Sequence, residues 1–437
     1  MSQPNQTTYL FVSGKNWKLS LAELTSYLTA REYLFEVTEV SRAFFAVRTE
    51  APLPPKIIDD LGGTLKIGQA STVVDTEVLA EAFLNESKQA KEQLRNALGL
   101  DILADAMPAA SSGKSVFGVS VYWSEPAFNR AAAAVQRFLG GSLKDELKTE
   151  GRKARFMGFP KGRPHPQLTP VEVLKKGLVE DHAEILLCIG KQKAYVGASV
   201  AVHNPFEFQK RDVEKPVQRR IFAIPPRVAK IMVNLAGCAA GKVFLDPFCG
   251  VGTILQEALL CRAKVIGVDI NRWCVEGAKR NLEWLRLEYS VDNADFAVVQ
   301  GDARKLTSRI REEVDCIATE PDLGPALRQV PTAPYAERII EKLTPLFTDF
   351  LREAHKVLRR SGRLVIVTPY IKVRSGKPGT MNIREIAADA GFEVVEPFRD
   401  VVFAESAAEF LLRQMSSFVD IDERHIVGRE IRVFQKP

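Results

Sequence analysis

Short apolar runs alternate with helical stretches through the C-terminal half of the chain, from residue 227 onward. Seven of these runs have the composition of β-strands, and the first four are short and bounded by turn residues, as buried parallel strands are. The last two are placed to close the sheet as an antiparallel hairpin. The pattern predicts a doubly wound α/β domain whose ligand lies at the carboxyl ends of the strands. The predicted strands are KVFLDPF, KVIGVDI, DFAVVQGD, VDCIATE, RLVIVTP, FEVVEPF and REIRVFQ.

The first 200 residues show a different pattern, in which strand-like and helix-like segments do not alternate regularly. It predicts an α+β region of mixed strands and helices. The helical segment 127–151 contains Gly140 and Gly141, where we expect an interruption, because glycine weakens a helix. The predicted strands are TYLFVSG, FEVTEV, RAFFAVRT, SVFGVSVYW, AEILLCIG and KAYVGASVAV, and the predicted helices are LSLAELTSYL, EVLAEAFLNESKQAKEQLRNALGL, AFNRAAAAVQRFLGGSLKDELKTEG and TPVEVLKKGLVE.

Residues 203–226 separate the two patterns. The segment lacks hydrophobic periodicity and contains four prolines, which favour extended chain. We therefore predict an extended linker, followed by the α/β domain at 227–437.

The composition is that of a soluble globular protein, with 46% hydrophobic and 26% charged residues over 437 positions. This length predicts two or three domains. No apolar run approaches the roughly 20 residues of a membrane span, and the N-terminus does not resemble a secretory signal. The six cysteines form no CxxC pair and no metal-ligand spacing, which is typical of a reducing compartment. We expect a cytoplasmic protein with no bound metal.

Positive charge is concentrated in one part of the chain. The net charge is only +6, but residues 151–220 contain 14 Lys/Arg against 7 Asp/Glu. Such a surplus is expected where a module binds a polyanion, although a solvated surface loop explains it equally well.

The loop after the first α/β strand, LDPFCGVGTIL, has the features of a ligand-binding loop. Gly250 and Gly252 allow a tight turn and a close approach to a ligand, and a helix beginning near Thr253 points its free N–H groups at the same place. A nicotinamide-binding fingerprint requires a glycine where this chain has Leu255, and a phosphate-binding P-loop requires a lysine that is absent.

Acidic residues follow three successive strands. Asp246 precedes the glycine loop, where it disfavours a pyrophosphate but suits a ligand that carries an ammonium and a sulfonium. Asp269 is placed to bind ribose hydroxyls, and Asp302 in the GDA segment is placed beside an adenine amine. Any one of them could simply cap the next helix. Together they favour S-adenosylmethionine, with the predicted contacts Asp246, Phe248, Gly250, Gly252, Thr253, Asp269, Ile270, Asp302 and Ala303.

These segments, followed by TEPDLGP at 319–325, resemble the motifs of methyltransferases that modify exocyclic amines of bases. With FEFQKRDVEKPVQRRIFAIPPRVAKIMVNLAG before them, they resemble in particular the THUMP-domain tRNA guanosine-N2 methyltransferases of the guanosine-10 type. The resemblance covers almost the whole chain and is most specific from about 203 to 325. It implies a Rossmann-like seven-stranded methyltransferase domain at 227–437, after a ferredoxin-like domain at 1–65 and a THUMP-like RNA-binding domain at 66–202.

The acceptor motif departs from that family. The family has Asp or Asn, then two prolines and an aromatic residue, and this chain has Glu320, Pro321, Asp322 and Leu323. The resemblance implies that the first side chain and a following backbone carbonyl accept the hydrogens of the target amine, so the catalytic candidates are Glu320, Pro321 and Asp322. Leu323 cannot stack on a base as an aromatic ring does. Tyr335 and Tyr370 are candidate substitutes, or ordinary half-buried tyrosines.

The resemblance implies that structured RNA, most simply tRNA, is the substrate and that one nucleotide is extruded into the active site. Two alternatives remain open, namely DNA adenine-N6 methylation and a catalytically impaired RNA-binding protein that retains the cofactor pocket. We expect a monomer, and an activating subunit stays an open possibility. The candidate RNA contacts are Arg152, Lys153, Arg155, Lys161 and Arg163.

Overall fold

The computed structural model describes residues 6–98, 115–158, 165–180, 183–219, 223–291, 295–404, 412 and 415–437. The chain divides into two compact units, and each is described by itself. One comprises Met1–Leu21, Tyr33–Pro205 and Val401–Ala408, and the other comprises Ala22–Glu32, Phe206–Asp400 and Glu409–Pro437. The domain boundaries expected after residues 65, 202 and 226 stay predictions. No helix in the described part of the chain is long and apolar enough to span a bilayer.

The first unit is built on one mixed eight-stranded sheet with the order β2-β3-β1-β4-β8-β7-β5-β6. The long β4 pairs with β1 and with β8, so the sheet is continuous. β5 runs parallel to β6 and β7, and the other pairs are antiparallel, in agreement with the predicted α+β pattern. The strands are β1 (Thr7–Ser13), β2 (Phe35–Val40), β3 (Phe44–Thr49), β4 (Thr64–Asp75), β5 (Ser115–Trp123), β6 (Ala154–Met157), β7 (Ala183–Ile189) and β8 (Lys193–Val202).

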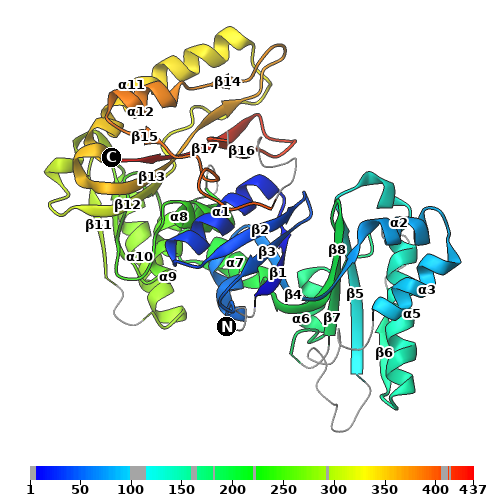
Figure 1. Ribbon diagram of the computed structural model, residues 1–437. Coiled ribbons are helices and arrows are strands. Elements are labelled where there is room, and N and C mark those ends of the chain that lie inside the picture. The colour runs from blue at the N-terminus through cyan, green and yellow to red at the C-terminus, as the bar shows by residue number, and fades with distance from the viewer. Residues whose placement is uncertain are drawn as a thin grey trace. The chain divides into compact units, whose positions relative to one another are not determined.

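Three helices cover one face of the β5–β8 part of this sheet (Figure 1). The helical stretch predicted near 77–100 is split into α2 (Thr76–Phe83) and α3 (Lys88–Ala97), with Ser87 capping the second helix through a bond from Ala90 N. The predicted interruption at the paired glycines is wrong, because α5 (Ala132–Thr149) runs straight through them. The first unit also contains α6 (Pro170–Lys175) and 3-10 turns at Pro55–Asp60 and Pro126–Asn129, and of α1 (Trp17–Ala30) only the residues up to Leu21 belong to it.

Packing explains why α5 keeps one of its glycines. A Cβ added to Gly140 would lie 2.3 Å from the Phe156 ring, whereas a Cβ on Gly141 would meet nothing within 4 Å. Gly140 therefore lets the helix approach β6 closely, and Gly141 has no such role.

The two glycines allow a matched stability test. Both Gly140→Ala and Gly141→Ala gain about 1 kcal/mol of helix propensity. Any difference between their free energies of unfolding therefore measures the clash of the new Cβ at position 140 with Phe156. We expect Gly140→Ala to have a free energy of unfolding about 1–3 kcal/mol below that of Gly141→Ala, as overpacked sites do. Denaturant unfolding of the full chain measures this difference. Equal stability of the two variants would contradict the packing explanation.

The second unit contains a nine-stranded sheet with the order β11-β10-β9-β12-β13-β17-β15, in which β14 also pairs with β13 and β16 with β17. The strands β9 to β13 are parallel, and β17 runs antiparallel to β13 and to β15. The strands are β9 (Val243–Asp246), β10 (Lys264–Asp269), β11 (Phe296–Gln300), β12 (Val314–Thr319), β13 (Leu358–Ile371), β14 (Gly379–Thr380), β15 (Glu393–Val394), β16 (Ser417–Asp420) and β17 (Val427–Gln435).

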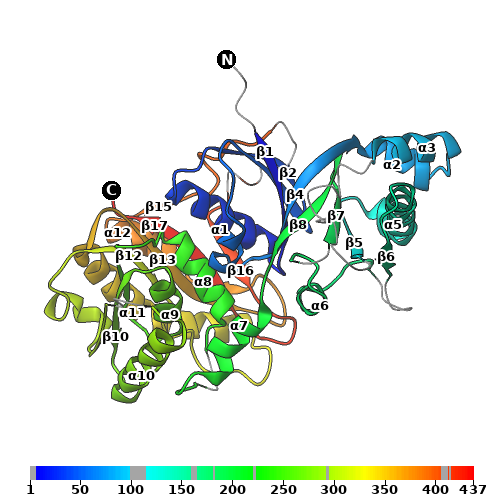
Figure 2. The same cartoon turned by 90° about the horizontal axis from the view of Figure 1, so that it is seen from below.

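Helices lie on both faces of this sheet, as a doubly wound domain requires (Figures 1 and 2). On one face, α11 buries Phe347, Phe350 and Leu351 in the core against the strands, and α12 buries Ile383 and Ala387 in the same core. The strand predicted over FEVVEPF is reduced to two residues, β15, although its antiparallel pairing with β17 is confirmed. The helices are α8 (Pro226–Leu235), α9 (Thr253–Leu260), α10 (Arg272–Glu288), α11 (Ala333–Val357) and α12 (Ile383–Asp389).

The predicted extended linker is partly helical. Residues Pro205–Gln209 form α7, and Lys210–Glu214 continue as a π-helical turn. The buried Arg211 donates a 2.6 Å bond to Glu257 on α9, and Lys230 lies 3.1 Å from the same carboxylate. The Arg211 ion pair holds the segment against α9 within the second unit, which is why it does not run as extended chain.

Candidate active site

The carboxyl ends of β9, β10 and β12 lie at one edge of the second sheet, because the three strands are parallel neighbours. The glycine loop follows β9, with φ values of +52° at Gly250 and +88° at Gly252. Gly252 is the N-cap of α9, and a Cβ there would lie 3.2 Å from Ala278 on α10. Both positions therefore require glycine, and the loop follows the conformation expected from the sequence.

Asp269, at the end of β10, is held by backbone donors. Gly250 N donates a 2.9 Å bond to one carboxylate oxygen, and Asn271 N donates a 2.8 Å bond to the other. A carboxylate has about four acceptor positions, so about two remain for further donors. The side chain is thus oriented by the glycine loop and can still accept hydroxyl groups of a ligand.

Asp246 is buried at the end of β9 and accepts a 2.6 Å bond from Thr319 Oγ1 and a 3.2 Å bond from Phe248 N. Its pKa is raised from 3.8 to about 7, mainly by burial and also by the nearby carboxylates of Asp269 and Glu320, while the two hydrogen bonds act in the opposite direction. A carboxylate in this position is stabilised by any ligand that brings a positive charge.

A cavity of about 60 Å³ joins the glycine loop to the acceptor motif. It brings together four of the predicted cofactor contacts, namely Asp246, Phe248, Gly250 and Thr253, with Glu320. The Thr253 hydroxyl accepts a 2.9 Å bond from the buried Lys215, which sets the orientation of that hydroxyl. Arg219 and Ile224, which precede α8 in sequence, also line the cavity.

The predicted contacts of the adenine end lie outside this cavity. The Asp302 carboxylate forms an ion pair with Arg304 at 2.7 Å and accepts a bond from Arg304 N, so it acts as a helix cap. The side-chain bond from Arg304 lowers the pKa of Asp302. Ala303 is buried, and Ile270 is 67% exposed beside Asp269.

Glu320, the first residue of the acceptor motif, is paired with an arginine from the far end of the chain. Arg429 on β17 donates through Nε to one carboxylate oxygen at 2.5 Å and through Nη2 to the other at 3.3 Å. Burial raises the pKa of Glu320, and Arg429 opposes that rise. Pro321 is buried, whereas Asp322 is exposed and accepts a 2.9 Å bond from Gly324 N.

Arg429 and Arg219 were not among the site residues predicted from the sequence. β17 runs antiparallel to β13 and β16, and this places Arg429 opposite Pro369 and Asp420 and within reach of Glu320, 109 positions earlier. No local pattern signals a partner at that separation. Arg219 lies in the segment predicted to be a linker, where a basic residue had no assigned role.

The remaining candidates lie elsewhere. Arg152 is half-buried, and Lys153 and Arg155 are exposed, next to or within β6 of the first unit. Lys161 and Arg163 lie outside the described residues. Tyr335 on α11 is 43% exposed, and Tyr370 on β13 is half-buried opposite Thr380. Among the residues described, no three or more His, Cys, Asp or Glu side chains gather in a way that could hold a metal ion.

All residues that line the cavity lie within a part of the chain that matches a known domain family. Residues 218–388 match UPF0020, the RMKL-like methyltransferase domain. Two relatives named tRNA (guanine(10)-N2)-dimethyltransferase are also similar to the chain. The protein of Methanothermobacter thermautotrophicus is 37% identical over 175 residues, which are 39% of this chain and 47% of the relative. The protein of Pyrococcus abyssi is 31% identical over 224 residues, which are 51% of this chain and 59% of the relative.

The chain therefore matches about half the length of these curated relatives. The expected resemblance to tRNA guanosine-N2 methyltransferases is confirmed.

The solved structure of TrmN from Thermus thermophilus covers 98% of this chain, and this chain covers 100% of that structure, with a TM-score of 0.52 at 17% sequence identity. At that identity the likeness concerns the fold alone, and it confirms the expected α/β class with a Rossmann-like domain. The ferredoxin-like and THUMP-like assignments stay predictions.

Proposed function

We propose that the protein is an S-adenosylmethionine-dependent methyltransferase that modifies the exocyclic N2 of a guanosine in tRNA. The observation that carries the proposal is that Glu320, at the end of β12, lines the same cavity as Asp246 and Gly250. A methyl donor and an acceptor amine must meet in such a place. The names of the relatives supply the nucleotide and the RNA class.

The residues of the glycine loop fit this cofactor. Asp269 retains acceptor positions for ribose hydroxyls, and the buried Asp246 suits the positive charge of the methionine end. The bound cofactor supplies an activated methyl group with a good leaving group. We assign the cofactor contacts to Asp246, Phe248, Gly250, Gly252, Thr253, Asp269 and Ile270. The Asp302 and Ala303 contacts belong to the proposal too, and Asp302 must share its carboxylate with Arg304.

The acceptor residues orient the target nitrogen in this proposal. The Glu320 carboxylate and the Pro321 backbone carbonyl accept the two hydrogens of the amine, so that its lone pair points at the methyl group. Arg429 holds Glu320 in a fixed orientation through two bonds. Most of the rate enhancement then comes from positioning, since these residues need not form a covalent bond.

The first unit is assigned to tRNA binding through Arg152, Lys153 and Arg155, with Lys161 and Arg163 completing the predicted set. These residues would contact phosphates and recognise the shape of the folded RNA, and would not contact base edges. A cytoplasmic location and a monomeric state accompany this proposal.

Transfer of labelled methyl groups to unmodified tRNA transcripts tests the function, with duplex DNA as the competing substrate. We expect label in tRNA, located on guanosine N2 after nuclease digestion, and none in DNA. Label in DNA would overturn the RNA assignment. If neither substrate takes label although the cofactor binds, the impaired RNA-binding alternative replaces the proposal.

A further inference from the structure

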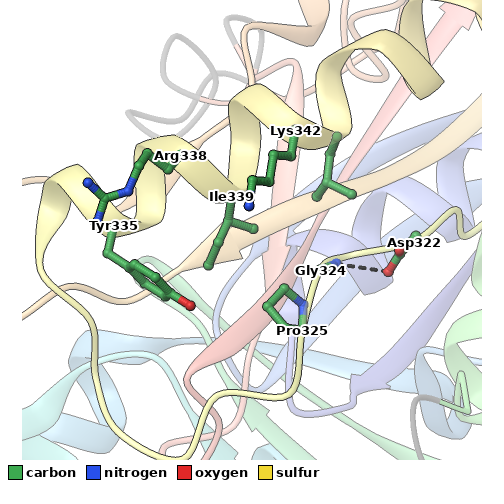
Figure 3. A pocket seen from close by; sticks show the side chains of 8 residues that line it. Asp322, Gly324, Pro325, Tyr335, Arg338, Ile339 and Lys342 are labelled. Atoms are coloured by element: carbon green, nitrogen blue, oxygen red, sulfur yellow. Dashed lines mark hydrogen bonds between the residues drawn. The ribbon is translucent and has the colours of Figure 1, made fainter.

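A second cavity lies directly beside the acceptor motif. It has a volume of about 390 Å³, and its lining comes from two short segments of the second unit. The acceptor loop contributes Asp322, Gly324 and Pro325, and α11 contributes Tyr335, Arg338, Ile339, Lys342 and Leu343 (Figure 3). The volume falls in the range of small-ligand pockets, about 300–1,000 Å³.

The side chains of this cavity form a cationic and an apolar part. Arg338 and Lys342 are exposed on neighbouring turns of α11, and neither has an ion-pair partner within 4 Å among the described residues. Pro325 and Ile339 provide apolar surface between the loop and the helix (Figure 3). The cavity can therefore hold a ligand that carries a negative charge at one end and a flat apolar group at the other.

Tyr335 supplies an aromatic surface at the same end of the helix. Its ring is 43% exposed and points across the cavity towards Pro325 (Figure 3). The Arg338 guanidinium lies 5.6 Å from the ring centroid, so one side chain positions the other. An exposed ring beside free cations is the combination that binds single-stranded nucleic acid, because bases stack on the ring and phosphates pair with the cations.

The position of the cavity indicates which nucleotide it would hold. Asp322 lines it and lies two residues after Glu320, which limits their separation to about 7 Å along the backbone. The Asp322 carboxylate accepts a bond from Gly324 N. Because this carboxylate repels a phosphate, a bound phosphate would lie on the helix side of the cavity. The cavity thus begins about one nucleotide away from the site at which the target amine is held.

We propose that this cavity binds the nucleotide adjacent to the methylated one, with its phosphate at Arg338 and Lys342 and its base on Tyr335. The inference rests on the proposed function, since it takes the acceptor site at Glu320 as given. Enzymes that extrude a base commonly contact the flanking nucleotides as well.

Neutralising single cations tests the phosphate contact. We expect Arg338→Ala and Lys342→Ala each to weaken tRNA binding roughly 3- to 10-fold and to reduce the slope of log Kd against log salt by about 0.7–0.9. Arg352→Ala is the matched control, because Arg352 is an exposed arginine of the same helix outside the cavity. Cofactor affinity should not change in any of them.

Removing the ring tests the base contact. We expect Tyr335→Ala to weaken tRNA binding about 5- to 100-fold, as loss of a stacked base does, and Tyr335→Phe to restore most of that affinity. If wild-type protein methylates tRNA but the cavity variants match Arg352→Ala in affinity and salt slope, this inference is overturned and the proposed function stands. If wild-type protein binds tRNA without methylating it, the proposed function fails. The affinities and salt slopes of the cavity variants then still show whether the cavity contacts tRNA. Absence of any tRNA binding overturns both.

Discussion

Replacing Asp246 by Asn is expected to weaken S-adenosylmethionine binding roughly 10- to 100-fold, because a charge-assisted hydrogen bond to the cofactor is lost while the side-chain shape is kept. The wild-type affinity should also depend on pH. The pKa of Asp246 is about 7, and a cationic ligand binds the ionised form. The affinity should therefore fall as the pH drops below 7, by up to about tenfold per unit. Isothermal titration of wild-type protein and variant between pH 6 and 8 measures both effects.

The same substitution should stabilise the protein without cofactor. The pKa of Asp246 is higher in the folded chain than its ordinary value of 3.8. The unfolded chain therefore releases this proton at lower pH, and the contribution of the group to stability is lost as the pH rises from about 4 through 7. At pH 8 we expect Asp246→Asn to raise the free energy of unfolding by about 1–4 kcal/mol. Unchanged cofactor affinity in the variant would exclude the assigned role, and unchanged stability would exclude the buried charge.

Replacing Arg429 by Met is expected to lower kcat about 100-fold while cofactor affinity stays within twofold. Arg429 positions Glu320 through two bonds, and a displaced acceptor of the amine hydrogens costs a factor of that order. The pKa of Glu320 should also rise in the variant, because the opposing guanidinium is gone. If Glu320 acts in its ionised form, the acidic limb of the kcat profile moves to higher pH. Single-turnover methyl transfer over pH 5–9 records both changes.

A variant of the same strand provides the control. Arg432 lies three residues after Arg429 on β17 and forms an ion pair with Glu430, so Arg432→Met breaks that pair and leaves Glu320 untouched. Its kcat and pH profile should stay close to those of the wild type. Arg429→Lys keeps the charge but cannot bind both carboxylate oxygens, so we expect an intermediate kcat. A loss of kcat in Arg429→Met without any shift of the pH profile would show that Arg429 supports only the local structure.

Much of the second unit follows from local sequence patterns. The parallel strands were predicted from short apolar runs, and the glycine loop from two glycines that do adopt positive φ. The prediction was poorer where tertiary contacts override local preference. Gly140 does not break α5, because the helix packs on Phe156, and residues 205–214 are helical because Arg211 is bound by Glu257.

The sequence by itself determined the doubly wound domain and the places of Asp246, Asp269 and Glu320 at strand ends, since strand periodicity and turn chemistry depend on neighbours in the chain. Only the tertiary structure decided the pKa of Asp246, the pairing of Glu320 with Arg429 and the cavity along α11. Burial and ion pairing depend on which side chains meet in space. Those side chains come from strands and helices up to 109 positions apart, a separation that no local pattern records.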